Sequence, residues 1–218
     1  MSDFDFLVIA RSLGFLGEGM LLSLGLAALA IVGGILCGAL LALLRLSRFK
    51  PLALAAAAYV NLFRSVPLIL VIFWIYFMVP LAAGRPVGPF YSALIAFVLF
   101  ETAYYCEIIR AGIQSIPRGQ LQAALASGLT RAQGMRHVVL PQAFRNMVPI
   151  LVTQCIILFQ DTSLVYVVTL RDFMTSATII ANRDLRIVEL YVFAAFVYLI
   201  LCASGSLLVR RLQRRLAR

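Results

Sequence analysis

Residues 105–145 read YCEIIRAGIQSIPRGQLQAALASGLTRAQGMRHVVLPQAFR, a polar, arginine-bearing segment set between long hydrophobic stretches. A membrane protein has little reason to interrupt its spans with a loop of this length unless the loop has a task. Residues 120–137 have a helix-compatible pattern, with Pro117 suited to a helix start and Pro141 marking the boundary of the next element. The segment therefore predicts a helical element that docks a partner at the membrane surface.

The composition places the rest of the chain in a bilayer. Of 218 residues, 63% are hydrophobic and 13% are charged, whereas soluble domains carry roughly 45–50% apolar and about 25% charged residues. The length suits one domain over residues 1–218.

Five stretches are apolar enough for spans of about 20 residues. They run from Gly19 to Leu44, from Pro51 to Pro80 with Arg64 and Pro67 inside, from about Pro89 to Ile109, from Pro141 to about Leu170, and from Leu190 to Val209. The sequence thus predicts an all-α integral membrane protein with five transmembrane helices, and Pro67 breaks or kinks the second. Residues 81–88 and 171–187 are expected to be outer connections.

The charges predict the orientation. The chain carries 19 Lys and Arg against 9 Asp and Glu, a net charge of +10. Nucleic acid is not the implied partner, because no groove combines aromatic with basic residues. The basic residues gather after the first span, in the loop of about 111–140 and in the tail 210–218, which suits an anchor to anionic lipid. We therefore expect segment 1–17 outside and the loop and the C-terminus in the cytoplasm.

Several site types are missing from the sequence. The four cysteines lie in apolar runs without CxxC spacing, and His137 is the only histidine, so neither a metal site nor a disulfide framework is predicted. The phosphate-binding pattern GxxxxGK[ST] is absent. The chain is therefore expected to bind no cofactor, and any ATP with its magnesium belongs to another polypeptide.

The loop resembles a family motif. Gln122-Ala123-Ala124-Leu125-Ala126-Ser127-Gly128, followed after nine residues by Val138-x-Leu140-Pro141, is similar to the EAA loop of ABC importer permeases, EAA-x3-G-x9-I-x-LP. Gln122 departs from the glutamate of that pattern. The resemblance implies a coupling helix seated in a groove of an ATPase. The contact residues it implies are Gln122, Ala123, Ala124, Gly128, Leu129, Leu140 and Pro141; Gly128 would let a partner backbone approach.

Other segments extend the resemblance to nearly the whole chain. They are Tyr59-Val60-Asn61-Leu62-Phe63-Arg64-Ser65-Val66-Pro67-Leu68, the Glu107-Ile108-Ile109-Arg110 region and Phe159-Gln160-Asp161-Thr162-Ser163-Leu164. They are similar to polar amino-acid permeases, and the likeness is closest to permeases of bacterial glutamate/aspartate importers. The resemblance implies the five-helix type I ABC importer (MetI-like) fold in the inner membrane. It also implies a second permease subunit, identical or related, a cytoplasmic ATPase dimer and a periplasmic amino-acid-binding protein.

Polar residues inside the spans are the candidates for the substrate path, because they are costly at membrane depth. They are Asn61, Arg64, Glu101, Gln154, Asp161, Thr162 and Ser163. Structural alternatives stay open. Arg64 would snorkel or pair with a carboxylate, the Asp161 segment would cap a broken helix, and Glu101 would hold a neighbouring helix. Glu107 and Arg110, three residues apart, are interpreted as a structural pair or a link into the loop.

Two other functions fit the sequence less well. An ion-coupled secondary amino-acid transporter usually shows an internal duplication, and none is evident; it would also leave the docking loop unexplained. A membrane enzyme is disfavoured because neither HExxH nor GxSxG occurs. The favoured mechanism is alternating access driven by a partner ATPase.

Overall fold

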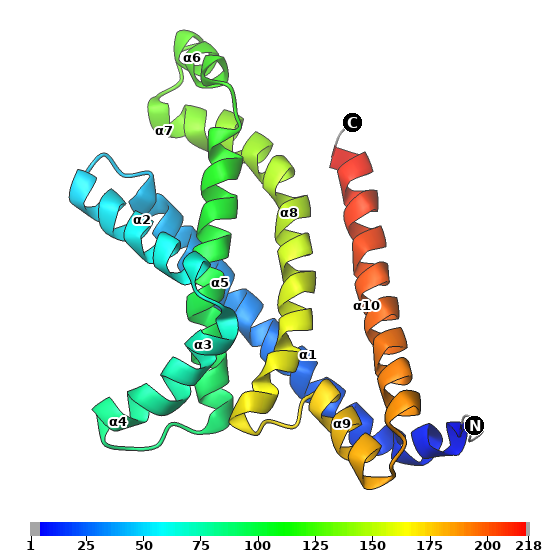
Figure 1. Ribbon diagram of the computed structural model, residues 1–218. Helices are drawn as coiled ribbons and strands as arrows, with labels where there is room; N and C mark the ends of the chain where they lie inside the picture. Colours follow the sequence, from blue (N-terminus) through cyan, green and yellow to red (C-terminus); the bar gives the residue numbers. More distant parts are fainter. Residues whose placement is uncertain (1–4, 217–218) are drawn as a thin grey trace.

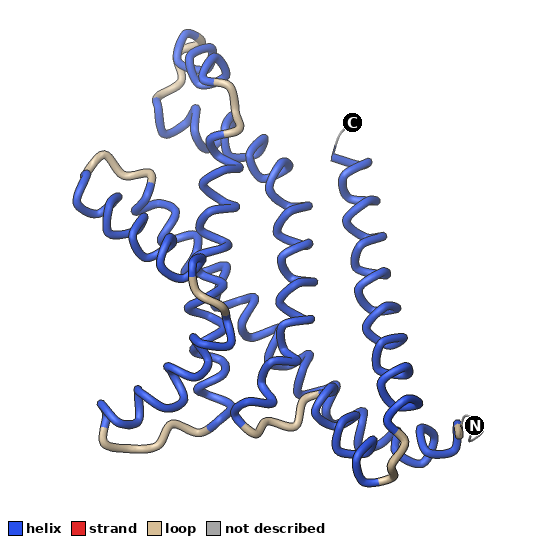
Figure 2. Tube along the Cα trace, in the orientation of Figure 1, coloured by secondary structure: helices blue, strands red, loops and turns tan. Residues whose placement is uncertain are grey.

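A computed structural model of the protein describes residues 5–216, and every regular element in that range is a helix (Figures 1 and 2). In chain order the elements are α1 (Phe6–Arg45), α2 (Lys50–Ser65), α3 (Leu68–Phe73), the π-helical turn η1 (Trp74–Met78), α4 (Val79–Ala83), α5 (Pro89–Gln114), α6 (Arg118–Ala126), α7 (Arg131–Gly134), the π-helical turn η2 (Met135–Val139), α8 (Leu140–Asp161), the 3₁₀ helix η3 (Thr162–Val168), α9 (Phe173–Arg183) and α10 (Ile187–Leu216).

Four helical stretches are long and apolar enough to cross a bilayer: Phe6–Arg45, Pro89–Gln114, Arg131–Val168 and Ile187–Arg214. Taken as one span, the helices Lys50–Ser65 and Leu68–Ala82, which are bent by 105° at a short break, give a fifth. Val66 at the break is extended, with φ −115° and ψ 137°, as expected for a residue that precedes a proline. The five predicted spans and the break at Pro67 match this arrangement.

The two ends of the molecule differ in what they carry. In Figure 1, α6, α7 and the C-terminal end of α10 lie at one end, and the start of α1 lies with α4 and α9 at the other. This placement agrees with an odd number of crossings. Which end faces the cytoplasm stays a prediction.

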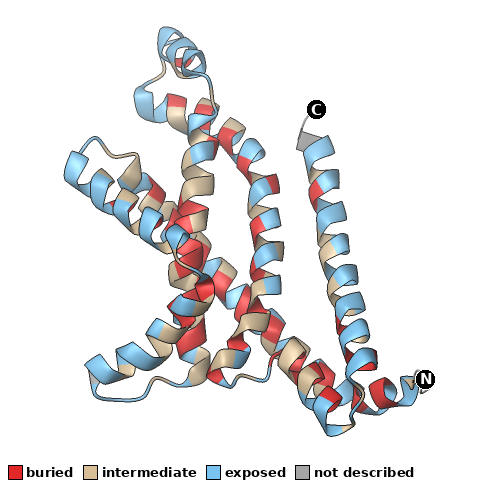
Figure 3. Cartoon of the chain, in the orientation of Figure 1, coloured by how far each residue is buried: buried red, intermediate tan, exposed pale blue. Residues whose placement is uncertain are grey.

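The principal helix contact is the crossing of α1 over α5, where buried side chains gather (Figure 3). It depends on Gly34 and Gly38, four residues apart in α1. A Cβ at Gly38 would lie 2.7 Å from Tyr105 Cβ and 3.0 Å from the backbone N of Cys106. Small residues at this spacing let two membrane helices approach closely.

We expect Gly38→Val to weaken this crossing, because the added side chain would meet backbone atoms of α5, which cannot move aside as a flexible side chain can. Overpacking of this kind costs about 1–3 kcal/mol, measurable as a lower midpoint of thermal unfolding in detergent. Gly25→Val is the matched control in the same helix, since no atom of the described residues lies within 4 Å of a Cβ there. An equal loss of stability in both variants would contradict this account of the crossing.

Both π-helical turns end two residues before a proline. η1 ends at Met78 before Pro80, and η2 ends at Val139 before Pro141. A proline removes one helical hydrogen bond and its ring collides with the carbonyl four residues earlier, and local widening of the helix accommodates it. The prediction that Pro141 marks an element boundary is confirmed, since it lies in the first turn of α8, which begins at Leu140 directly after η2. The backbone stays helical across this boundary, from Arg131 to Val168.

Three expectations need correction or refinement. Residues 120–137 are not one helix but α6, α7 and most of η2, with a break at 127–130. The outer connection 171–187 contains α9, whose N-cap Asp172 accepts hydrogen bonds from Met174 N and Thr175 N at 3.0 Å. Segment 1–17 is largely the first turns of α1, and its residues 1–4, like 217–218 of the tail, lie outside the described range.

Candidate functional site

The break between α6 and α7 is built by local hydrogen bonds. After α6, Gly128 N donates to Leu125 O at 3.0 Å and Leu129 N donates to Ala124 O at 3.1 Å, the two bonds of a Schellman motif. Gly128 sits at its left-handed position with φ +85°. Thr130 then begins α7 with a capping box that it shares with Gln133. The sequence thus fixes a sharp corner in the loop.

Gly128 has a conformational role that the sequence analysis did not give it. No described atom lies within 4 Å of a Cβ placed there, and its positive φ requires glycine; the approach of a partner backbone stays a prediction. A close approach within the chain occurs at Gly134, where a Cβ would lie 3.3 Å from Ala124 Cβ and 3.0 Å from Leu121 Cδ1. Ala124 is only 6% exposed as a result. It holds α6 on α7, while Gln122 and Ala123 face outward.

Polar contacts fix this loop to the spans on either side. Asn146 Nδ2 of α8 donates to Ser115 Oγ after α5 at 2.9 Å, and Gln142 Nε2 donates to Val138 O at 2.8 Å. Leu140 and Pro141 are exposed beside these contacts, and Leu129 is half-buried. The Asn146–Ser115 bond therefore joins the start of α8 to the end of α5 where the loop leaves the spans.

An ion cluster lies where α5 approaches the loop. Glu107 of α5 accepts hydrogen bonds from Arg110 of the same helix and from Arg45 at the end of α1. All three side chains are largely shielded, between 18% and 24% exposed. The predicted pair of Glu107 and Arg110 is confirmed, and the structure adds Arg45, which the sequence interpretation had assigned only to orientation.

A second polar contact lies at the α1–α5–α8 junction. The Glu101 carboxylate is fully buried and accepts both of its hydrogen bonds from Gln154 Nε2, at 3.1 and 3.2 Å. Gly34 of α1 packs against Glu101: a Cβ added at Gly34 would lie 2.9 Å from Glu101 Cβ. Beside it, Tyr105 Oη lies 3.5 Å from Cys155 Sγ. In this arrangement Glu101 joins two helices, which agrees with its structural alternative.

Asp161 is placed differently. It ends α8, and its side chain makes no cap for η3. Its carboxylate has neither a hydrogen bond nor an ion pair with another described residue. The capping alternative applies to Thr162, the buried C-cap of α8, whose Oγ1 donates to Phe159 O at 2.7 Å. Ser163 lines a largely apolar cavity of about 470 Å³ with Leu164, Met174 and Ile179, and Tyr166, Thr175, Thr178 and Tyr191 add hydroxyl-bearing side chains.

Asn61 and Arg64 lie apart from these groups. Both are exposed on the last turns of α2, before the break at Pro67. The guanidinium carbon of Arg64 lies 5.5 Å from the centroid of the Tyr104 ring, a cation–π contact. Arg64 thus packs on an aromatic ring and pairs with no carboxylate in the described chain.

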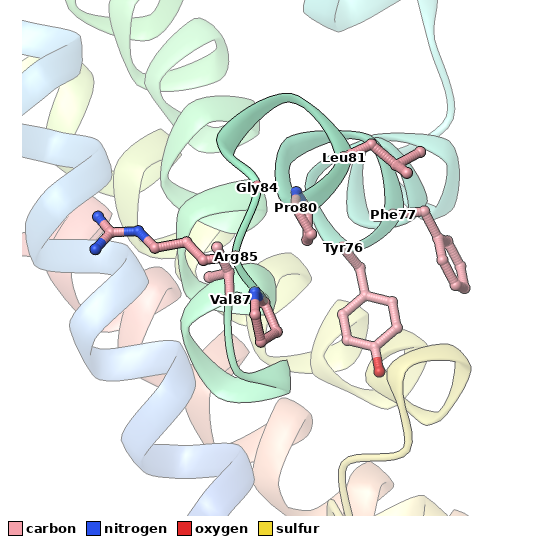
Figure 4. A pocket seen from close by; sticks show the side chains of 8 residues that line it. Tyr76, Phe77, Pro80, Leu81, Gly84, Arg85 and Val87 are labelled. Carbon is pink, nitrogen blue, oxygen red and sulfur yellow. The ribbon is translucent and has the colours of Figure 1, made fainter.

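Two features mark the end of the molecule opposite the loop. A cavity of about 560 Å³ opens among Tyr76, Phe77, Pro80, Leu81 and residues 84–87, as shown in Figure 4, and it contains none of the predicted site residues. The Asp184 carboxylate accepts hydrogen bonds from Arg183 Nε at 2.9 Å and from Arg11 Nη2 of α1 at 3.2 Å. The bonds from Arg183 lower the pKa of Asp184. This network ties the start of α1 to the α9–α10 turn.

Comparisons with known proteins decide the family. The family described as "Binding-protein-dependent transport system inner membrane component" matches residues 34–218. This chain belongs to that family. The permease is 51% identical to the glutamate/aspartate import permease protein GltK of Escherichia coli O6:H1, over 100% of both chains. It is 37% identical to the probable glutamine ABC transporter permease protein GlnM of Bacillus subtilis, over 86% of this chain and 87% of that protein.

A solved structure supports the same fold. A chain of the crystal structure of an amino acid ABC transporter with histidines matches the permease with a TM-score of 0.91 and 33% identity, covering 97% of this chain and 98% of that chain. The permease is thus an inner-membrane, MetI-like ABC importer subunit for polar amino acids. The resemblance drawn from residues 122–141 and its neighbouring segments is confirmed.

Proposed function

We propose that the permease carries glutamate or aspartate across the inner membrane as part of an ATP-driven importer. The observation that supports this substrate is the 51% identity to a glutamate/aspartate import permease, which extends over the full length of both chains. Relatives at 37% identity or below include glutamine and arginine permeases. The acidic amino acids are therefore the first choice within a family of polar amino-acid substrates.

The proposed assembly has four kinds of component. This chain pairs with a second permease subunit, identical or related, and an ATPase dimer binds at the α6–α7 end, which faces the cytoplasm. A periplasmic amino-acid-binding protein delivers substrate at the end that carries α9. ATP and magnesium belong to the ATPase, because the permease has no phosphate-binding loop. Gln122, Ala123, Gly128, Leu129, Leu140 and Pro141 form the outward contact with the ATPase, and Ala124 supports them from within.

The loop geometry explains how such a contact would act. Its corner at Gly128 is set by backbone hydrogen bonds, and its ends are bonded to α5 and α8. Movement of α6 by the ATPase would shift two spans together and open the permease pair alternately to each side. The bond between Glu101 and Gln154 joins the same two spans deeper in the membrane.

The proposed substrate path passes the end of α8. There Asp161 is available for the ammonium group of an amino acid, and Thr162 and Ser163 begin η3, with Ser163 at the edge of the 470 Å³ cavity. Asn61 and Arg64 on α2 are the candidates for the carboxylate groups, since both are exposed in the single chain. Glu101 and Gln154 bond to each other and would position the path.

The proposal is tested by uptake in proteoliposomes that contain the complete complex and its binding protein. We expect ATP-dependent accumulation of radiolabelled glutamate that an excess of unlabelled glutamate or aspartate abolishes. Glutamine or arginine at the same excess is expected to leave most of the radiolabelled glutamate uptake intact. Accumulation without ATP along an ion gradient would contradict the importer assignment, and competition by glutamine or arginine alone would contradict the substrate assignment.

A further inference from the structure

A basic cavity of about 350 Å³ lies between the end of α1, the first turns of α2 and the last turns of α5. It lies outside the proposed substrate path and the α6–α7 corner. Three cationic side chains line it, Arg45, Lys50 and Arg110. They come from three different helices, so the tertiary fold brings this charge together.

The positive charge in the cavity is only partly neutralised. Glu107 is the carboxylate that pairs with Arg45 and Arg110. The Arg110 guanidinium also donates a hydrogen bond to Gln114 Oε1. Lys50 has no ion pair and no side-chain hydrogen bond with another described residue. The cavity therefore holds three cations against one anion, and a ligand with one negative charge would improve the balance.

The α2 part of the lining beyond Lys50 is apolar. It is formed by Ala53, Leu54 and Ala57 along the first two turns of α2, and Leu54 is 70% exposed. A small hydrophilic anion gains nothing from such a wall. A phosphodiester that carries acyl chains matches both parts, because its charge meets the cations while a chain covers the leucine. Basic pockets between spans at a membrane surface bind anionic headgroups in this way.

We propose that this cavity binds the phosphodiester headgroup of an anionic phospholipid such as phosphatidylglycerol. Lys50 and the Arg45 guanidinium meet the phosphate, and an acyl chain runs along Ala53, Leu54 and Ala57. Arg110 and Glu107 hold the Arg45 side chain in place. The bound lipid would join α1, α2 and α5 close to the point where α5 leads into the loop.

The test uses the complete permease–ATPase complex, delipidated in detergent and titrated with phosphatidylglycerol or phosphatidylethanolamine in native mass spectrometry. We expect preferential binding of phosphatidylglycerol. Lys50→Gln is expected to weaken it about fivefold, since one basic residue at a membrane surface contributes roughly 1 kcal/mol. Ala57→Phe fills the apolar wall without changing any charge and is expected to weaken binding as well. Lys50→Arg is expected to retain it.

The matched control is Arg85→Gln, which removes a cation from the apolar cavity at the other end of the molecule. It is expected to leave the affinity for phosphatidylglycerol unchanged, and an equal loss in this variant would overturn the proposal. Equal binding of the two lipids, or displacement of phosphatidylglycerol by an excess of inorganic phosphate, would also overturn it. Release of the ATPase by Lys50→Gln at unchanged lipid binding would assign the cavity to a protein interface instead.

Discussion

Replacing Gly128 by aspartate is expected to leave the permease inserted in the membrane but to abolish its association with the ATPase. Gly128 holds φ +85° at the corner between α6 and α7, a conformation that costs an ordinary L-residue about 1–2 kcal/mol. The substitution also places a charged side chain on an exposed corner that is proposed to meet the partner. We expect co-purified ATPase to fall at least about tenfold, equivalent to about 1.4 kcal/mol of binding free energy.

The matched control is Gly84→Asp. Gly84 also has a positive φ, +66°, and nothing lies within 4 Å of a Cβ there, but it lies at the opposite end of the molecule (Figure 1). It therefore imposes the same kind of backbone strain and the same charge without touching the loop. We expect Gly84→Asp to retain the ATPase at wild-type yield. Retention by both variants would show that the corner at Gly128 does not carry the contact.

Local sequence patterns predict the arrangement of the spans. Apolar length and the position of Pro67 predict the crossings and the bend of the second span, because both follow from short-range chemistry. The pairing of Glu107 with Arg110 follows from helical spacing in the same way. Two further local signals predict structure. The pattern Gly34-x-x-x-Gly38 indicates a close helix crossing, and Asp172 three residues before Thr175 indicates the start of α9.

Other features depend on contacts between distant parts of the chain. Glu101 and Gln154 are 53 residues apart and meet only because α5 and α8 pack together. Arg45 reaches Glu107 across 62 residues for a similar reason, the crossing of α1 and α5. The sequence marks Glu101 and Gln154 as costly within a span, and Arg45 and Glu107 as polar groups at span ends, but it does not say which residues bond to one another. That distinction separates a structural residue from one that remains available to a substrate.

The same distinction separates the two acidic candidates for the substrate path. Glu101 is fully buried and bonded to Gln154. Glu101→Ala would leave the Gln154 amide without its partner, and the expected loss is one of assembly and stability. Glu101→Gln keeps a hydrogen-bonding side chain of the same size and is expected to restore the yield of the complex. A role for Glu101 in the chemistry of substrate binding would instead appear as lost uptake in a fully assembled Glu101→Gln complex.

Asp161→Asn is expected to reduce uptake strongly while the complex assembles at normal yield. Asp161 makes no ion pair or side-chain hydrogen bond that the substitution would break in the described chain, so stability has little to lose. A carboxylate left unpaired within a span is costly and points to a functional partner. A hydrogen bond to a charged group contributes about 1.5–3 kcal/mol, so kcat/KM for glutamate uptake should fall roughly ten- to hundredfold. The matched control adds Gln160→Glu to the Asp161→Asn variant. This double variant keeps a carboxylate but moves it by one residue, and it should not restore transport. Normal uptake by Asp161→Asn alone would remove this residue from the path and leave the α2 residues Asn61 and Arg64 as its principal candidates.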